Sequence, residues 1–243
     1  MVRTTDAVGH VVERTGVFDA AVSEALHRLA DPGDLVIDVG ANVGYMTSLL
    51  ALRVGDTGKV ICFEPQPGVR DDLEKNVMRW RSQGLDTEIE VRCEGLSSSS
   101  GVGHMSYALP GESRDGQSLV DGARAEPDGL WEVPLARLDD LLDLETTSIG
   151  VLKLDVEGHE QHVLLGTEAL LSRRSIRDIV FEEHGAYPTP TTKLVGASWI
   201  PSVQARPDAL RAVDRPTGFE PTANDGSELR GDARSATRTR PVE

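Results

Sequence analysis

The sequence predicts an α/β protein in which helices flank a mostly parallel central sheet. Strand-type and helix-type segments alternate along residues 18–184, which is the order required when helices connect parallel strands. The strand-type segments are short, continuous apolar runs, which are typical of strands that helices cover on both faces. We therefore expect five core strands, at residues 35–40, 59–64, 88–93, 151–155 and 178–182.

Helices are expected before and between these strands because apolar residues recur there with helical spacing. The first helix starts near Phe18 and stops at Asp31-Pro32-Gly33. The second helix follows the first strand and ends at Gly55, and the third carries its apolar stripe along residues 69–80. A short helix at residues 138–142 is expected to lead into the fourth strand.

Two regions interrupt this alternation. Glycine, serine and aspartate cluster in residues 97–134, which we interpret as an insertion that forms a hairpin and a loop on the substrate side. After His184 the apolar periodicity fades, and only residues 199–203 and 219–223 suggest further edge strands. The predicted organisation is an N-terminal segment at 1–17, one α/β domain at 18–224 and a disordered tail at 225–243.

The charge balance excludes several classes of partner. The 243 residues include 25 Lys and Arg against 40 Asp and Glu, a net charge of −15, which repels nucleic acids and anionic lipid surfaces. No apolar run approaches the roughly 20 residues of a membrane helix, and the first residues do not resemble a secretory signal. We expect a cytoplasmic protein without nucleic-acid or membrane partners, and its oligomeric state stays open. Cys62 and Cys93 are expected to be buried thiols.

The segment VIDVGANVGY, residues 36–45, indicates a nucleotide-like cofactor. A buried strand runs there into a turn at Gly40 and Gly44, and these glycines allow a ligand to approach the backbone closely. The dinucleotide fingerprint G-x-G-x-x-G would need further glycines where this chain has Asn42 and Tyr45. An NAD-binding loop is therefore disfavoured.

The acidic residues near this turn favour S-adenosylmethionine instead. Asp38 suits a cofactor that carries an ammonium and a sulfonium rather than phosphates. Glu64 ends the second strand, where its carboxylate can accept hydrogen bonds from both ribose hydroxyls. Glu94 and Leu96 follow the third strand and are expected to line an adenine. In the alternative interpretation, Asn42 caps a helix and the acidic residues lie on a solvated sheet edge.

A second group of polar residues follows the fourth strand and points to the chemistry. Asp155, Glu157 and His159 lie at the end of this strand, at the edge of the sheet where ligands bind. Transfer of a methyl group from S-adenosylmethionine to a hydroxyl needs a group there that takes the hydroxyl proton. His184, at the end of the fifth strand, competes with His159 for the role of general base. It also stays open whether any base is needed. Glu160 is expected to stabilise the N-terminus of a helix electrostatically, and His162 is expected to be solvated.

A metal site is the competing interpretation of this group. Carboxylates and imidazoles at short spacing can coordinate a cation, but neither an H-E-x-x-H motif nor paired cysteines are present. We therefore predict no metal.

These motifs together resemble the FkbM-type family of S-adenosylmethionine-dependent methyltransferases. The segment 152–160, LKLDVEGHE, is the most specific part of the resemblance, which covers about residues 16–184. The other matching segments are DVGANVGY at 38–45, FEP at 63–65 and LDDL at 138–141.

The resemblance implies a class I, Rossmann-like fold whose seven-stranded sheet has a reversed last strand. It further implies O-methylation of hydroxyls on polyketides, sugars and other secondary metabolites. Carried onto this chain, it assigns cofactor binding to Asp38, Gly40, Asn42 and Glu64. It places Asp155, Glu157 and His159 at the methyl-transfer site.

The sequence thus favours an S-adenosylmethionine-dependent O-methyltransferase that acts on a hydroxylated small molecule. One alternative is a non-catalytic, methyltransferase-like binding protein with an eroded C-terminus, because residues 201–243 offer little to complete the sheet. A less favoured alternative is an NAD-dependent oxidoreductase on a similar sheet.

Overall fold

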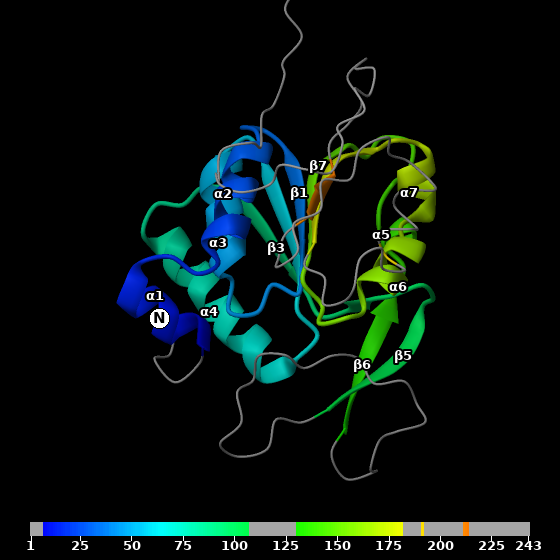
Figure 1. Ribbon diagram of the computed structural model, residues 1–243, viewed down its shortest axis with the longest axis horizontal. Coiled ribbons are helices and arrows are strands. Elements are labelled where there is room, and N and C mark those ends of the chain that lie inside the picture. Colours follow the sequence, from blue (N-terminus) through cyan, green and yellow to red (C-terminus); the bar gives the residue numbers. More distant parts are fainter. Residues whose placement is uncertain (1–6, 107–129, 182–190, 192–210, 214–243) are drawn as a thin grey trace, which may run out of the picture.

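The protein is described by a computed structural model, which places residues 7–106, 130–181, 191 and 211–213. The described chain is built around a six-stranded sheet with the order β3-β2-β1-β7-β8-β9 (Figure 1). Neighbouring strands are parallel except at the β8–β9 edge, where β9 runs antiparallel. The strands are β1 (Leu35–Val39), β2 (Lys59–Phe63), β3 (Glu88–Arg92), β7 (Ile149–Leu154), β8 (Ile176–Phe181) and β9 (Arg211–Val213).

The five predicted core strands are confirmed, and each predicted boundary lies within two residues of the observed one. The reversed strand that the resemblance implies is present as β9. The edge strands expected at 199–203 and 219–223, and the tail expected at 225–243, lie outside the described residues.

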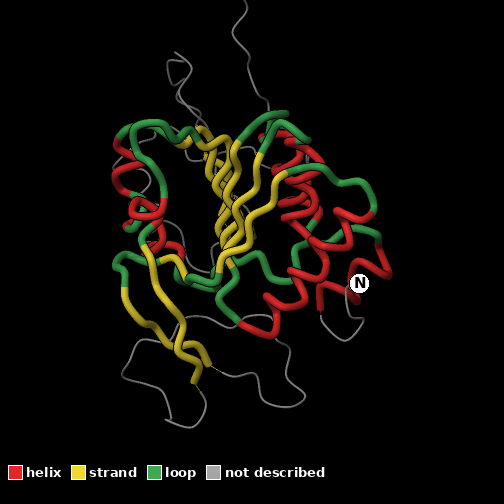
Figure 2. Tube along the Cα trace, turned by 180° about the vertical axis from the view of Figure 1, so that it is seen from behind, coloured by secondary structure: helices red, strands yellow, loops and turns green. Residues whose placement is uncertain are grey.

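Helices cover both faces of the sheet, as Figures 1 and 2 show. On one face lie α1 (Ala7–Thr15), α2 (Ala20–Leu29), α3 (Tyr45–Val54) and α4 (Pro67–Ser82). On the other face lie α5 (Leu138–Leu141), α6 (Glu160–Leu165) and α7 (Glu168–Ser172). No helix in the described ranges has both the length and the apolar character needed to cross a membrane.

The two faces bury separate cores because successive side chains of a strand point to opposite sides. Ile37 and Leu152 belong to the core under α5–α7, whereas their neighbours Val36 and Val151 belong to the core under α2–α4. This alternation also decides where the polar residues of the strands point. Lys153 shares the α3 face with Val151.

The insertion forms a second, three-stranded sheet that extends from the body of the protein (Figure 1). Strand β5 (Gly101–Ser106) pairs antiparallel with β6 (Leu130–Ala136), which confirms the expected hairpin. The short strand β4 (Gly95–Leu96) pairs parallel with β6 and was not expected from the sequence. Residues 107–129 of the insertion lie outside the described residues.

The prediction of two buried thiols is half wrong. Cys62 lies in the central strand β2 and is buried, but Cys93 is exposed. Cys93 directly follows β3, the edge strand of the sheet, where no further strand covers it.

Asp139, in the LDDL segment, ties α5 to the start of α7. Its carboxylate oxygens accept hydrogen bonds from the backbone amides of Ala169 at 2.9 Å and Leu170 at 3.1 Å. Thr167, the residue that precedes α7, provides no side-chain cap, so Asp139 satisfies the otherwise unpaired amides of the first turn. Arg137 pairs with the same carboxylate at 2.9 Å.

We expect Asp139→Ala to lower the free energy of unfolding by about 2 kcal/mol, because buried amides lose a charged acceptor. Urea denaturation followed by circular dichroism measures this difference. The matched control is Asp140→Ala, which removes the exposed neighbouring carboxylate and should change stability by less than about 0.5 kcal/mol. Equal effects of the two substitutions would refute the capping role.

Candidate active site

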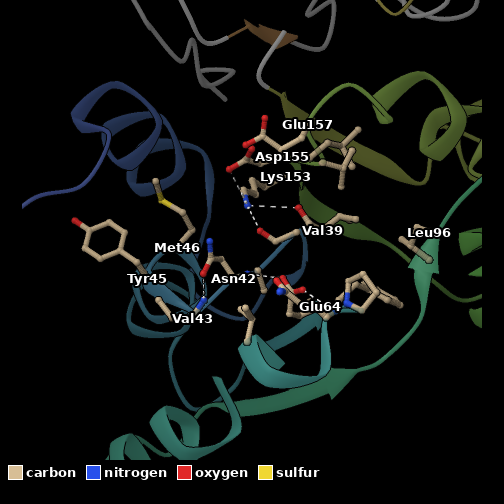
Figure 3. Close-up of a pocket in the computed structure, with 18 of the residues that line it drawn as sticks. Val39, Asn42, Val43, Tyr45, Met46, Glu64, Leu96, Lys153, Asp155 and Glu157 are labelled. Carbon is tan, nitrogen blue, oxygen red and sulfur yellow. Dashed lines mark hydrogen bonds and ion pairs between the residues drawn. The ribbon is translucent and has the colours of Figure 1, made fainter. Parts of the chain in front are cut away.

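A cavity of about 470 Å³ opens at the carboxyl edge of the central sheet. Its walls come from the ends of β1, β2, β7 and β8, from α1 and the starts of α2, α3 and α4, and from β4 and β5. This edge is where open α/β sheets bind their ligands. Figure 3 shows several of the lining side chains.

The loop after β1 is held close to the turn after β7, and Gly40 makes this approach possible. Gly40 has φ +74°, and a Cβ at this position would lie 1.9 Å from the carbonyl oxygen of Asp155. The amides of Gly40 and Ala41 both donate to the carbonyl of Phe63 at 3.0 Å. Any side chain at position 40 would therefore push the loop away from the neighbouring strand.

Glu64 is fixed at the cavity wall by two backbone amides. Asn42 donates to Oε2 and Gln66 donates to Oε1, each at 2.9 Å. Glu64 is only 7 % exposed. Burial raises the pKa of this carboxyl, and the two amide hydrogen bonds offset only part of that increase. Each oxygen keeps a lone pair for a ligand, because a carboxylate offers about four acceptor sites.

The interpretation of this region as a capped helix beside a solvated edge is wrong. Asn42 has φ 51° and its side chain accepts the amide of Val43 at 2.7 Å, whereas Gly44 is the residue that precedes α3. Asp38 and Glu64 are both buried rather than solvated.

Asp38 lies behind the cavity wall and is paired with Lys153. The two residues are direct partners in the β1–β7 ladder, and Lys153 Nζ is 3.0 Å from Asp38 Oδ1. The other oxygen, Oδ2, accepts a hydrogen bond from the Thr47 hydroxyl at 2.6 Å. Asp38 is fully buried and does not line the cavity. Asp38 therefore supports the loop from behind the cavity wall.

Lys153 also reaches the loop itself. Its ammonium donates to the carbonyl of Gly40 at 2.9 Å and lies 3.7 Å from Asp155 Oδ2 (Figure 3). Burial lowers the pKa of Lys153, but the negative charges of Asp38, Asp155 and Glu64 raise it by more than burial lowers it. The net shift of the pKa is therefore upward. Sequence reasoning did not single out Lys153. The available signal was a lysine inside an otherwise apolar strand, VLKL.

The turn after β7 presents the other predicted polar residues to the cavity. Asp155 and Glu157 lie together at its rim (Figure 3), and the Asp155 side chain is 37 % exposed. Glu157 has φ 53°. Glu160 lies in the first turn of α6, as expected, and its buried carboxylate accepts the amides of Val156 at 3.2 Å and Gly158 at 3.1 Å. Glu160 therefore closes the turn, whereas His162 is exposed as expected.

The cavity brings most of the predicted site residues together and leaves three out. Asp38 and Gly44 do not line it, and His184 lies outside the described residues. The predicted residues that line it are Gly40, Asn42, Glu64, Glu94, Leu96, Asp155, Glu157 and His159.

Several lining residues were missed by sequence reasoning. Asp19, Met46, Met105 and Phe181 come from separate elements, and nothing in the sequence marks them as neighbours. Among the described residues, no group of three or more His, Cys, Asp or Glu side chains could hold a metal ion.

This chain resembles solved structures and curated proteins, among them the following three. The methyltransferase FkbM from Methylobacillus flagellatus has a TM-score of 0.51 at 16 % identity, over 86 % of this chain and 60 % of that one, which supports the fold alone. The hexuronic acid methyltransferase AglP of Haloferax volcanii is 32 % identical over 80 % of this chain and 74 % of AglP. The AMB antimetabolite synthetase AmbE of Pseudomonas aeruginosa is 32 % identical over 82 % of this chain. That match covers only 10 % of AmbE, so this chain spans about a tenth of its length.

The family comparison identifies the domain. The methyltransferase FkbM domain matches residues 38–195, a range that starts at Asp38 and includes both the loop after β1 and the turn after β7. Since this match covers more than half of the chain, the chain belongs to the FkbM methyltransferase family, which confirms the predicted class I fold and the predicted enzyme class.

Proposed function

We propose that this enzyme transfers the methyl group of S-adenosylmethionine to a hydroxyl group of a small molecule. The observation that carries the proposal is the composition of one cavity. Its β2 side holds Glu64, a buried and fixed carboxylate, and its β7 side holds His159 and Asp155. The first side suits a ribose, and the second suits a reaction that removes a proton.

The nucleoside half of the cofactor fits the side of the cavity near β2 and β4. The remaining lone pairs of Glu64 would accept the two ribose hydroxyls. Glu94 Oε2 is buried and has no hydrogen-bond partner among the described residues, although its Oε1 lies 3.6 Å from Arg92. An amino group on an adenine would supply the missing donor, and Leu96 would pack against the ring.

The charges of the cavity suit a cationic ligand. Asp19, Asp155 and Glu157 line it together with Glu64 and Glu94, whereas the ammonium of Lys153 is already paired. Carboxylates attract the ammonium and sulfonium of S-adenosylmethionine, most strongly where little water screens them. The same charges would disfavour the pyrophosphate of NAD.

When bound, S-adenosylmethionine supplies a methyl group on a cationic sulfur that a nucleophilic oxygen can displace in line. The residues of this chain then have two tasks: to hold the acceptor hydroxyl opposite the sulfur and to take its proton. His159 is our candidate for the proton acceptor, because it lines the cavity and an imidazole can serve as a general base. Asp155 and Glu157 are the alternatives on the same turn.

The acceptor belongs, in this proposal, to the sugars, polyketides or similar hydroxylated metabolites. AglP matches 80 % of this chain over 74 % of its own length, and its name, hexuronic acid methyltransferase, supports a sugar-like acceptor. Met105, on strand β5 of the insertion, lines the cavity, which supports a role of the insertion in acceptor selection.

Calorimetric titration with S-adenosylmethionine, S-adenosylhomocysteine and NAD tests the cofactor. The proposal expects micromolar binding of the first two, about −8 kcal/mol, and none of NAD. Labelled S-adenosylmethionine, offered with hexuronic acids, neutral glycosides and macrolactones, then tests the acceptor. A folded sample that binds neither sulfur compound would instead support the non-catalytic binding protein.

The first prediction about the site concerns Glu64. Glu64→Gln keeps the shape of the side chain but loses its charge and one acceptor, so we expect affinity for S-adenosylmethionine to fall about 10- to 100-fold in calorimetry. Glu74→Gln, at an exposed position of α4, should leave the affinity unchanged.

The raised pKa of Glu64 adds a pH dependence to the same measurement. As the pH falls through that pKa, the carboxylate becomes protonated, so wild-type affinity should weaken at a higher pH than an ordinary glutamate would cause. Glu64→Gln should lack this component. Equal affinities of wild type and Glu64→Gln for S-adenosylmethionine at pH 8 would show that the Glu64 carboxylate does not bind the cofactor.

The second prediction concerns the buried ion pair. Lys153→Met leaves the carboxylate of Asp38 buried without its cation, so we expect the free energy of unfolding to fall by about 3–5 kcal/mol. The double variant Asp38→Asn/Lys153→Met should recover part of this loss, because no unpaired charge remains. Lys59→Met, which removes a lysine from half-buried surface pairs on β2, should lower stability by only about 1 kcal/mol. Urea denaturation compares the four proteins, and a double variant that is no more stable than Lys153→Met would contradict the pairing.

The third prediction concerns His159. His159→Gln should lower kcat about 100-fold or more while the dissociation constant of S-adenosylmethionine stays within about twofold, because the imidazole acts on the acceptor and not on the cofactor. Single-turnover methyl transfer and calorimetry measure the two quantities. His27→Gln, on the exposed face of α2, is the control. An unchanged kcat in His159→Gln would shift the role to Asp155 or Glu157, or show that no base is needed.

A further inference from the structure

Asp19 places a carboxylate in the wall of the cavity, directly before α2. Its Oδ1 accepts a hydrogen bond from the amide of Val22 at 3.1 Å, so the side chain caps this helix. The cap uses only one of the roughly four acceptor positions of a carboxylate. The Asp19 side chain can therefore bind a cationic group in the cavity while it continues to cap α2.

The segment that carries Asp19 is held against the start of α3. The ring of Phe18 meets the ring of Tyr45 edge to face, with centroids 6.0 Å apart. The hydroxyl of Ser23 donates to the carbonyl of Phe18 at 2.8 Å and lies 3.9 Å from Met46 Sδ. Tyr45 and Met46 are the first two residues of α3, which follows the loop after β1. These contacts fix the position of Asp19 relative to that loop.

The backbone at Asp19 has a conformation that few residue types tolerate. Its φ is 38° and its ψ is 80°, in the left-handed region. Among residues other than glycine, Asp and Asn are enriched there, because their short polar side chains can form local hydrogen bonds. Both types are also among the best residues at a helix N-cap. Asparagine at this position would therefore keep the backbone and the cap and remove only the charge.

The cavity extends from the nucleoside side, past the loop after β1, to the start of α3. In Figure 3, Leu96 and Met46 lie on opposite sides, and Glu64 lies between them. A cofactor whose adenine packs against Leu96 and whose ribose binds Glu64 consequently directs its amino-acid end towards Met46. Asp19 lines this same cavity beside the start of α3. Its carboxylate thus lies at the end of the cavity that is remote from the adenine.

We propose that Asp19 is a further cofactor-binding residue, whose carboxylate binds the α-ammonium group of S-adenosylmethionine. This inference rests on the proposed function, because it requires that cofactor in this cavity. The α-ammonium belongs to the amino-acid end of the cofactor, and a carboxylate binds an ammonium strongly where little water screens the pair. The same charge makes the site select against nucleosides that lack an ammonium, such as methylthioadenosine.

Calorimetric titration of the full chain with two ligands tests this role. One ligand is S-adenosylhomocysteine, and the other is its deamino analogue, in which a hydrogen replaces the α-ammonium group. Wild type should bind S-adenosylhomocysteine about 10- to 100-fold more tightly, because only this ligand offers a cation to Asp19. Asp19→Asn should lose about tenfold in affinity for S-adenosylhomocysteine. Its affinity for the deamino analogue should stay the same or rise, since the α-carboxylate of that ligand then meets less negative charge.

Two controls separate the charge of Asp19 from its cap. Asp19→Asn should unfold at the same urea concentration as wild type, since asparagine keeps the hydrogen bond to Val22. Asp56→Asn removes one negative charge from the exposed turn before β2 and should change neither affinity. Because both ligands are measured on the same variant, a general loss of structure would weaken the binding of both alike.

The outcomes distinguish this proposal from the function on which it rests. If wild type binds S-adenosylhomocysteine and Asp19→Asn binds it equally well, the role of Asp19 is overturned and the proposed function stands. Equal losses of affinity for both ligands in Asp19→Asn would likewise overturn the role, because the lost interaction would not involve the ammonium. A folded wild type that binds neither ligand would overturn the proposed function together with this inference.

Discussion

The ion pair between Lys153 and Asp38 is the interaction on which the site depends. It joins partner positions of β1 and β7, so it lies directly beneath the loop that forms the cavity floor. Burying two charges costs several kcal/mol each, and such a pair often adds little to stability. Here the ammonium also bonds the carbonyl of Gly40, and the Thr47 hydroxyl donates to Asp38 Oδ2, while Oδ1 is held by the ion pair. The ion pair therefore acts mainly to hold the loop after β1 in position.

The position of that loop determines how the cavity is divided. Strand β1 lies between β2 and β7, so the loop that follows it touches the ends of both. Its amide at Asn42 holds Glu64 on the β2 side, and Gly40 packs against the Asp155 carbonyl on the β7 side. A ligand that fills the cavity consequently meets a fixed carboxylate at one end and the polar turn at the other. This division matches a cofactor whose ribose and reactive sulfur are several bonds apart.

Much of the fold followed from the sequence because its signals are local. Continuous apolar runs marked the five core strands, and glycine turns marked the helix boundaries. Strand β4 was missed because two residues give no periodicity, and its pairing with β6 depends on residues forty positions away. The exposure of Cys93 was missed because an apolar run does not reveal that its strand is at an edge.

The sequence predicted which residues form the site better than it predicted what each residue contacts. The motifs after β1, β2 and β7 named most of the residues that line the cavity. The pairing of Asp38 was missed because its partner, Lys153, is 115 positions away, and only the strand order makes them neighbours. Glu160 was expected only to stabilise a helix N-terminus, since nothing in the sequence shows that its carboxylate also accepts the amides of Val156 and Gly158. Local sequence patterns cannot predict contacts between segments that are distant in the sequence.

A crystal structure of the enzyme with S-adenosylhomocysteine tests the central claim most directly. Our account predicts both ribose hydroxyls within hydrogen-bond distance of Glu64, the adenine amino group beside Glu94, and the sulfur facing the turn that carries Asp155 and His159. A ligand bound in this cavity with its ribose away from Glu64, or bound elsewhere on the protein, would contradict the account.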